Sequence, residues 1–257
     1  MKKNLKMQMI FVLAAAVMFQ LTGCIQEAEE EDKEGPTNYK ETITVKSQQV
    51  WIRDIDDLSP NTAYHRFTGN RDMIVLIRVY NSSDASGLGW KQIDTGAIAD
   101  GKLSFGIGMP EAGDLMDIND LRTRNLRFWK DVNFSVQGAK YTYFEVDSSV
   151  GDRLTRERLV GGKSTLSQEI IQFIYVDADC KITGNPDEFI DATVHPTIWH
   201  AEGDLNLSLK AGWNTIFRTE TYSDSDDPAI AGKAVVKMRM KNPDNLKWTI
   251  YDPSYLN

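Results

Sequence analysis

The sequence predicts an all-β fold, and three observations lead to that prediction. From Lys40 onward, apolar and polar residues alternate with a period of two, as in strands that have one face in a core and the other in water. Turn-forming pairs such as Asp100-Gly101 separate the alternating segments. Helical spacing is scarce. We therefore expect a β-sandwich, either one large sandwich or two tandem antiparallel ones, with one or two short helices.

Strand patterns recur along the whole of this region. The alternating apolar residues are Ile43 and Val45; Leu103, Phe105, Ile107 and Met109; Leu205, Leu207 and Leu209; Val236, Met238 and Met240; and Leu246, Trp248 and Ile250. Two continuous apolar runs, 73–80 and 170–176, predict central strands that are covered on both faces. The similarity of these two runs also hints at an internal duplication.

The expected turns agree with the strands. Asp100-Gly101 and Ala211-Gly212 each stand between two strand patterns, as the two residues of a tight hairpin do. Residues 242–245 separate the last two strands.

Two segments have other spacings. Leu115, Ile118 and Leu121 predict one short helix. The segment 154–171 fits either a helix or strands, because Gly161-Gly162 interrupts its pattern.

We divide the chain into four segments. Residues 1–23 are an expected signal peptide and residues 24–39 an acidic tether. Residues 40–130 and 131–257 are the two expected β-sandwich units, with a single large sandwich as the alternative.

The first 24 residues have the order of a bacterial export signal. Three lysines lie within the first six residues, and a mostly apolar run follows from Met9 to Leu21. This run is too short to span a bilayer, which takes roughly 20 apolar residues. Because a cysteine follows the small residue, Leu21-Thr22-Gly23-Cys24 is similar to the lipobox of bacterial lipoproteins. The resemblance implies cleavage before Cys24, lipidation of that cysteine and attachment to a membrane.

The tether is strongly acidic. Residues 25–39 hold six acids and one lysine, so the segment repels itself and stays extended. It is interpreted as a spacer, or as a segment that resembles the surface-export signal of some diderm lipoproteins. Ile25 is not aspartate, so the inner-membrane retention pattern of enteric lipoproteins is absent.

The charge balance bears on the partner. The formal net charge is −8, and removal of residues 1–23 takes away three more lysines. An acidic chain argues against nucleic acid as a partner, because phosphates need a basic surface.

The chain has two cysteines. If Cys24 carries lipid, Cys180 has no disulfide partner within the chain, and we interpret it as a small buried side chain.

Short phrases in the second half carry a further resemblance. They are FIYVD (173–177), KITG (181–184), LNLSLKAGWN (205–214) and NLKW (245–248). With them, residues 165–250 resemble the β-rich lipoproteins of the spirochaete type. The resemblance implies a β-sandwich on a lipid anchor, in a family without an assigned biochemical activity.

Catalytic signatures are missing from the sequence. Residues 161–165 have the tail of a phosphate-binding loop, but Glu157 stands where that loop needs a glycine. A G-x-S-x-G elbow does not occur, and the three histidines lack partners for a triad. We therefore predict that the protein is not an enzyme and needs no cofactor, with an exported hydrolase as a minor alternative.

The sequence offers candidate ligands for two kinds of metal site. Asp191, His195, His200 and Glu202 are the candidate zinc ligands, but the two histidines are five residues apart and do not share a face of a strand. We interpret them as loop residues.

Clustered aspartates are weak candidates for calcium. One pair is Asp177 and Asp179, and a second cluster is Asp224, Asp226 and Asp227. Solvated turns are the main interpretation of both.

Of the six tryptophans, Trp213 and Trp248 lie in alternating strands and are expected in the core. Trp90 and Trp199 are the candidate ligand contacts, because aromatic rings stack on sugars.

These observations predict a non-catalytic, lipid-anchored protein of the outer membrane, facing the periplasm or the cell surface, with a binding or envelope-structural role. The alternative is a carbohydrate-binding β-sandwich module that serves a glycan uptake or degradation system. The expected partners are the membrane, through the lipid, and a protein or glycan ligand.

Overall fold

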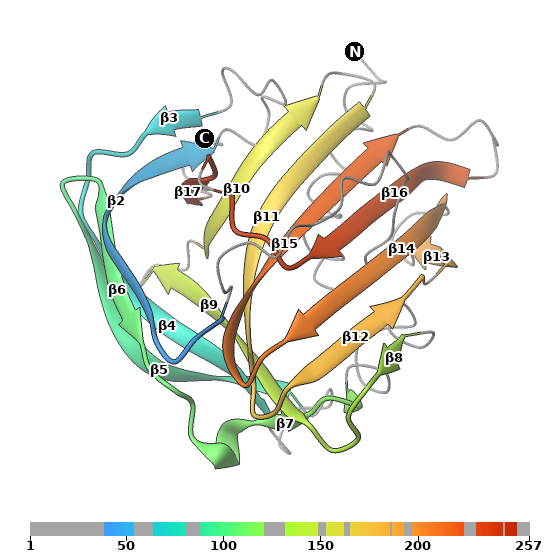
Figure 1. The fold of residues 1–257 in the computed structure, drawn as a ribbon. Coiled ribbons are helices and arrows are strands. Elements are labelled where there is room, and N and C mark those ends of the chain that lie inside the picture. The colour runs from blue at the N-terminus through green and yellow to red at the C-terminus, as the bar shows by residue number, and fades with distance from the viewer. Residues whose placement is uncertain are drawn as a thin grey trace.

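The computed structural model describes ten stretches of the chain. They are residues 39–53, 64–80, 88–120, 132–148, 153–161, 165–185, 187–192, 197–223, 230–243 and 245–250. Strands make up most of these residues, which confirms the all-β prediction (Figure 1).

The elements are β1 (Tyr39–Lys40), β2 (Ile43–Arg53), β3 (Tyr64–Arg66), β4 (Arg71–Tyr80), β5 (Leu88–Ala99), β6 (Lys102–Ile107), the 3-10 turn η1 (Ala112–Asp114), β7 (Met116–Asp117), β8 (Asn133–Phe134), β9 (Lys140–Ser148), β10 (Arg153–Gly161), β11 (Thr165–Val176), β12 (Cys180–Gly184), β13 (Asp187–Ala192), β14 (Thr197–Leu209), β15 (Gly212–Ser223), β16 (Ile230–Arg239) and β17 (Lys247–Ile250).

Hydrogen bonds join these strands into one continuous system with two parts. Seven strands close into a ring in the order β2, β6, β5, β4, β9, β10, β17 and back to β2. An open sheet begins at β11, which pairs with β10 and β9 of the ring, and continues through β15, β16 and β14. Strands β12 and β13 both pair with β14, and β8 pairs with β12. Figure 1 shows the curved ring strands on the left and the open sheet on the right.

Each part has its own core. The ring core holds residues such as Met73, Leu103 and Trp248. The open-sheet core lies on one face of β11 to β16 and includes Ile182 and Leu207. Most of the alternating residues that the sequence marks as inward, from Ile43 to Ile250, are buried in one of these cores. The exceptions are Met109, which is 66% exposed, Val45 and Met240, which are partly buried, and Leu246, which is buried outside both cores.

Strand β11 lies between the two cores. Ile174 and Val176 are buried in the open-sheet core, whereas Phe173 and Tyr175 pack against the ring core. The prediction of a strand covered on both faces is therefore confirmed for residues 173–176.

The Asp100-Gly101 hairpin is confirmed. Ala99 pairs with Lys102 across it, and both turn residues have positive φ angles of 50° and 74°. Two left-handed residues match the right-handed twist of the flanking strands.

The tight hairpin expected at Ala211-Gly212 is wrong in its strand pairing. The turn joins β14 to β15, but β16 lies between these strands, parallel to β14 and antiparallel to β15. The Asn214 side chain holds the turn instead: its Oδ1 accepts from the Lys210 N–H at 2.9 Å, and its amide donates to the Lys210 carbonyl at 2.7 Å.

The helix expected from Leu115 to Leu121 is not formed at its start. Leu115 has an extended backbone, Met116–Asp117 is strand β7, and the Ile118 N–H donates to the Ala139 carbonyl. Pairing with the start of β9 replaces helical bonds here, and Leu121 lies outside the described residues. The ambiguous segment 154–171 holds strands β10 and β11.

Strands from either side of residue 130 pair with each other, β4 with β9 and β17 with β2. The division into two units near that residue stays a prediction.

Cys180 is buried, at 4% exposure, and burial raises the pKa of its thiol. Across the described stretches, no helix is long and apolar enough to cross a membrane.

Candidate functional site

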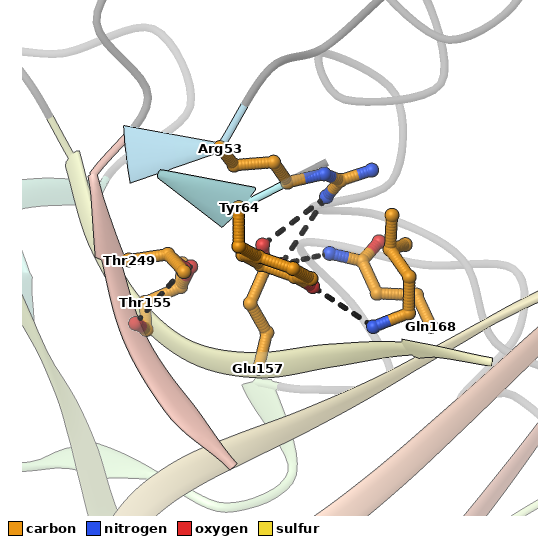
Figure 2. A network of polar contacts seen from close by, with 7 residues as sticks. Arg53, Tyr64, Thr155, Glu157, Gln168 and Thr249 are labelled. Carbon is orange, nitrogen blue, oxygen red and sulfur yellow. Dashed lines mark hydrogen bonds and ion pairs between the residues drawn. The ribbon is translucent and has the colours of Figure 1, made fainter. Parts of the chain in front are cut away.

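A group of buried polar side chains lies on one face of the sheet where the ring meets the open sheet. We call Arg53, Tyr64, Glu157 and Gln168 the polar network (Figure 2). Strand pairing brings them together: Arg53 on β2 is opposite Tyr64 on β3, and Gln168 on β11 is opposite Leu159 on β10. Because alternate residues share a face, Glu157 lies beside Leu159 on that face.

Glu157 is the centre of the network. Its side chain is fully buried, and both of its carboxylate oxygens accept hydrogen bonds from Nη1 of Arg53 at 3.3 Å. The Gln168 amide donates a further hydrogen bond to Oε2. A buried carboxylate is costly unless such partners meet its charge, so the three side chains stabilise the fold only as a set.

Tyr64 closes the network on the side of β3. Its hydroxyl oxygen accepts the backbone N–H of Leu159 at 2.8 Å. Burial raises the pKa of Tyr64 well above its ordinary value, and the negative charge of Glu157 raises it further. The phenol is therefore neutral at physiological pH.

Lys247 forms the rim of the site. It pairs directly with Glu157 across β17 and β10, and its Nζ lies 4.7 Å from the ring centroid of Trp51 and 4.4 Å from that of Tyr64. Burial lowers the pKa of Lys247, while the two rings stabilise its cationic form. Thr155 and Thr249 join the same two strands through their hydroxyls, 3.1 Å apart.

A second buried ion pair continues the polar face onto β15. Arg218 and Glu220, both less than 10% exposed, contact each other there, and Glu220 is opposite Gln168 in the sheet. Buried polar side chains thus lie on three neighbouring strands, with Glu157 on β10, Gln168 on β11, and Arg218 and Glu220 on β15.

This arrangement favours a structural role. Glu157 is enclosed by Arg53 and Gln168, so its oxygens face protein donors rather than solvent. Such an arrangement locks β2, β10 and β11 together, and it does not favour proton transfer to a substrate.

Trp90, one of the two predicted ligand contacts, is half-buried. Arg78 on β4 is the cross-strand partner of Trp90, and its guanidinium lies 4.8 Å from the Trp90 ring centroid. The Tyr143 ring packs edge to face against Trp90, with the two ring centroids 5.6 Å apart. Trp90 is therefore a fixed ring with a cation over it, and only part of its surface is open to a ligand.

The other predicted site residues are described in part or not at all. Trp199 lies in β14, where its backbone pairs with Ile190. Cys24, His195, Asp224, Asp226 and Asp227 lie outside the described residues.

The candidate zinc ligands can be followed only in part. The interpretation as loop residues is wrong for the three that are described, because Asp191 lies in strand β13 and His200 and Glu202 lie in its neighbour β14. The Glu202 carboxylate contacts Lys233. In the stretches that the structure describes, no three His, Cys, Asp or Glu side chains are grouped closely enough to hold a metal ion.

Asp177 and Asp179 serve different turns. Asp177 accepts the Lys140 N–H at 2.7 Å, and Asp179 accepts the Ala211 N–H at 3.0 Å and the Lys210 ammonium at 2.7 Å. These bonds, the one from Lys210 first, lower the pKa of Asp179. The contacts support the interpretation of both aspartates as turn residues.

Sequence reasoning missed the polar network. Glu157 and Gln168 lie in phase with the apolar residues Leu159 and Ile170, and this phase was the available signal that they point inward. Comparisons with family models, with curated proteins and with solved structures found no match to the chain. The resemblance to spirochaete-type lipoproteins therefore stays a prediction.

Proposed function

We propose that this is a non-catalytic, lipid-anchored protein of the outer membrane or cell surface with a binding or envelope-structural role. The observation that carries the proposal is the segment Leu21-Thr22-Gly23-Cys24 after a short apolar run, followed at once by the acidic tether. Two or three acyl chains on one cysteine hold a protein firmly at a bilayer.

The described start of the fold supports this arrangement. Strand β1 begins at Tyr39, the last residue of the tether, and pairs with Trp213 and Asn214 of β15. Trp213 is 1% exposed and donates from Nε1 to the Gly108 carbonyl at 2.8 Å. The tether thus ends on a well-packed part of the molecule, which suits a spacer between a lipid and a folded domain.

Metabolic labelling with a palmitate analogue tests the anchor. The wild type should be labelled and Cys24→Ala should not. Cys180→Ala is the matched control, because it removes the other cysteine of the chain and should leave labelling unchanged. Equal labelling of the wild type and Cys24→Ala would overturn the proposal. Protease shaving of intact cells then distinguishes outward from periplasmic display.

The second candidate function is carbohydrate binding. Half-buried Trp90, held by Arg78 and Tyr143, is a rigid ring of the kind that stacks on sugars. Binding to a glycan array should be lost in Trp90→Ala or Trp199→Ala. Trp51→Ala, which removes a half-buried tryptophan from strand β2, should keep it. Binding that survives in both of the first two variants contradicts this candidate.

A further inference from the structure

The face of the sheet opposite the polar network has a different character. Its residues alternate with those of the network along the same strands, so Arg156 and Arg158 flank Glu157 and point the other way. We call this surface, formed by β10, β11, β15, β16, β14 and β12, the basic face. Strand pairing aligns Arg158, Glu169, Thr219, Lys237 and Asp204 in one row across it.

Positive charge is in excess on the basic face. The basic side chains described there are Arg156, Arg158, Lys181, Lys233, Lys237 and Arg239, and the acidic ones are Glu169, Glu202 and Asp204. The side chains described on this face are therefore net positive, whereas the whole chain has a net charge of −8. A local excess of one sign concentrates ligands of the other.

Each of the three acids described on the face has a basic partner. Arg158 donates to Glu169 at 2.8 Å across β10 and β11. Arg239 pairs with Asp204, and Lys233 pairs with Glu202.

Two lysines add positive charge beyond these pairs. Lys237 lies between Thr219 and Asp204 in the middle of the face, and the Asp204 carboxylate contacts Arg239. Lys181 is exposed on β12. These two lysines are therefore the groups best placed to meet an added anion.

Between the charges lie small polar side chains. They are Ser167, Thr183, Asn206, Ser208, Thr219 and Thr221. Neighbouring strands are about 4.8 Å apart, and alternate residues along a strand are about 6.7 Å apart, so charged groups and hydroxyl or amide groups form a regular grid on this face. The apolar residues Ile171, Phe217 and Val235 lie within it. Such a grid matches a polymer that alternates carboxylates with hydroxyls.

We propose that the basic face binds an anionic polysaccharide that carries carboxylate groups. Val160, 38% exposed, is the large exposed apolar side chain described on this face. A membrane surface or a protein partner would call for a larger apolar patch. This ligand class goes beyond the proposed function and is independent of the lipid anchor.

The test measures retention of the full chain, purified in detergent, on polygalacturonate in affinity electrophoresis, with neutral dextran as the reference polymer. Polygalacturonate should retain the wild type, and retention should fall as salt screens the charges. Lys237→Glu and Lys181→Glu should each weaken binding roughly fivefold to tenfold. Lys46→Glu and Lys102→Glu are the matched controls, since they make the same charge change at exposed positions on ring strands β2 and β6.

Several outcomes overturn the inference. They are absence of retention, equal retention on dextran, and an equal loss in the control variants. Tighter binding to phosphatidylglycerol vesicles or to a DNA oligonucleotide also overturns it, because the ligand would then be another polyanion. Circular dichroism shows which variants are folded, and Lys181 alone decides the matter if Lys237→Glu does not fold. Palmitate labelling of Cys24 is independent of all these results.

Discussion

Arg53 and Glu157 form a buried ion pair across a strand that separates their own strands. Strand β17 lies between β2 and β10, yet Nη1 of Arg53 is 3.3 Å from both oxygens of Glu157, with the side chains 4% and 0% exposed. The pair connects segments 104 residues apart in the chain. Removal of one partner would therefore leave an uncompensated charge in the interior.

The first prediction concerns this pair. Arg53→Met should lower the free energy of unfolding by about 3–5 kcal/mol, because it strands the Glu157 carboxylate. The double variant Arg53→Met/Glu157→Leu should recover most of that loss, since neither charge remains. Denaturant unfolding measures both. A double variant as unstable as the single one would show that the two residues act independently.

Because of Tyr64, we predict that the stability of the protein depends on pH in the alkaline range. Its pKa in the folded protein is raised by burial, then by Glu157, so the folded state keeps the phenol proton after the unfolded state has lost it near pH 10. The stabilisation is complete below pH 10 and is lost as the pH rises above it, at about 1.4 kcal/mol per pH unit.

The variant Tyr64→Phe isolates this effect. Free energies of unfolding of both proteins, measured from pH 8 to 11, should differ by a constant below pH 10, where the variant has lost the bond from the Leu159 N–H. Above pH 10 the difference should shrink. Parallel curves over the whole range would contradict the assignment.

We predict that position 101, a glycine, tolerates no side chain. Its φ is +74°, and a Cβ there would lie 2.0 Å from the Phe67 carbonyl oxygen, which is backbone and cannot move aside cheaply. Gly101→Ala should destabilise the protein by more than the roughly 1–3 kcal/mol of left-handed strain alone. Gly138→Ala separates the two costs, because Gly138 has φ +78° and open space around it. Equal losses in thermal unfolding would exclude the clash.

We predict that replacing a core tryptophan lowers the free energy of unfolding more than replacing a half-buried one. Trp213 is 1% exposed and meets Phe144 and Tyr175 edge to face, so Trp213→Ala should cost about 3–5 kcal/mol of unfolding free energy. Trp90→Ala should cost clearly less, because that ring is half-buried. Calorimetry or denaturant titration compares them. Similar losses would mean that Trp90 is a core residue and not a candidate ligand contact.

The strands of this fold were predictable from local pattern, but their order in the sheet was not. The alternation around Leu207 and Met238 predicts two buried faces correctly, since burial sets a period of two in each strand. Nothing local shows that β16 lies between β14 and β15, because that order depends on contacts far apart in the chain.

The sequence analysis missed the conformation at the start of the expected helix and the polar network for different reasons. Three apolar residues at helical spacing also fit an irregular segment, and Ile118 is buried through its bond to Ala139 rather than by a helix. Glu157 is a charged strand residue, and a charged side chain is expected to face solvent. Its partner Arg53 lies on a strand that is distant in the sequence. A buried ion pair cannot be recognised until both of its strands are placed.

The intact mass of the N-terminal peptide of the protein from its native membrane tests the central claim most directly. The proposed anchor predicts a chain that begins at Cys24 and carries the added mass of acyl groups on that residue. A chain that begins at Met1, or one with an unmodified Cys24, would contradict it.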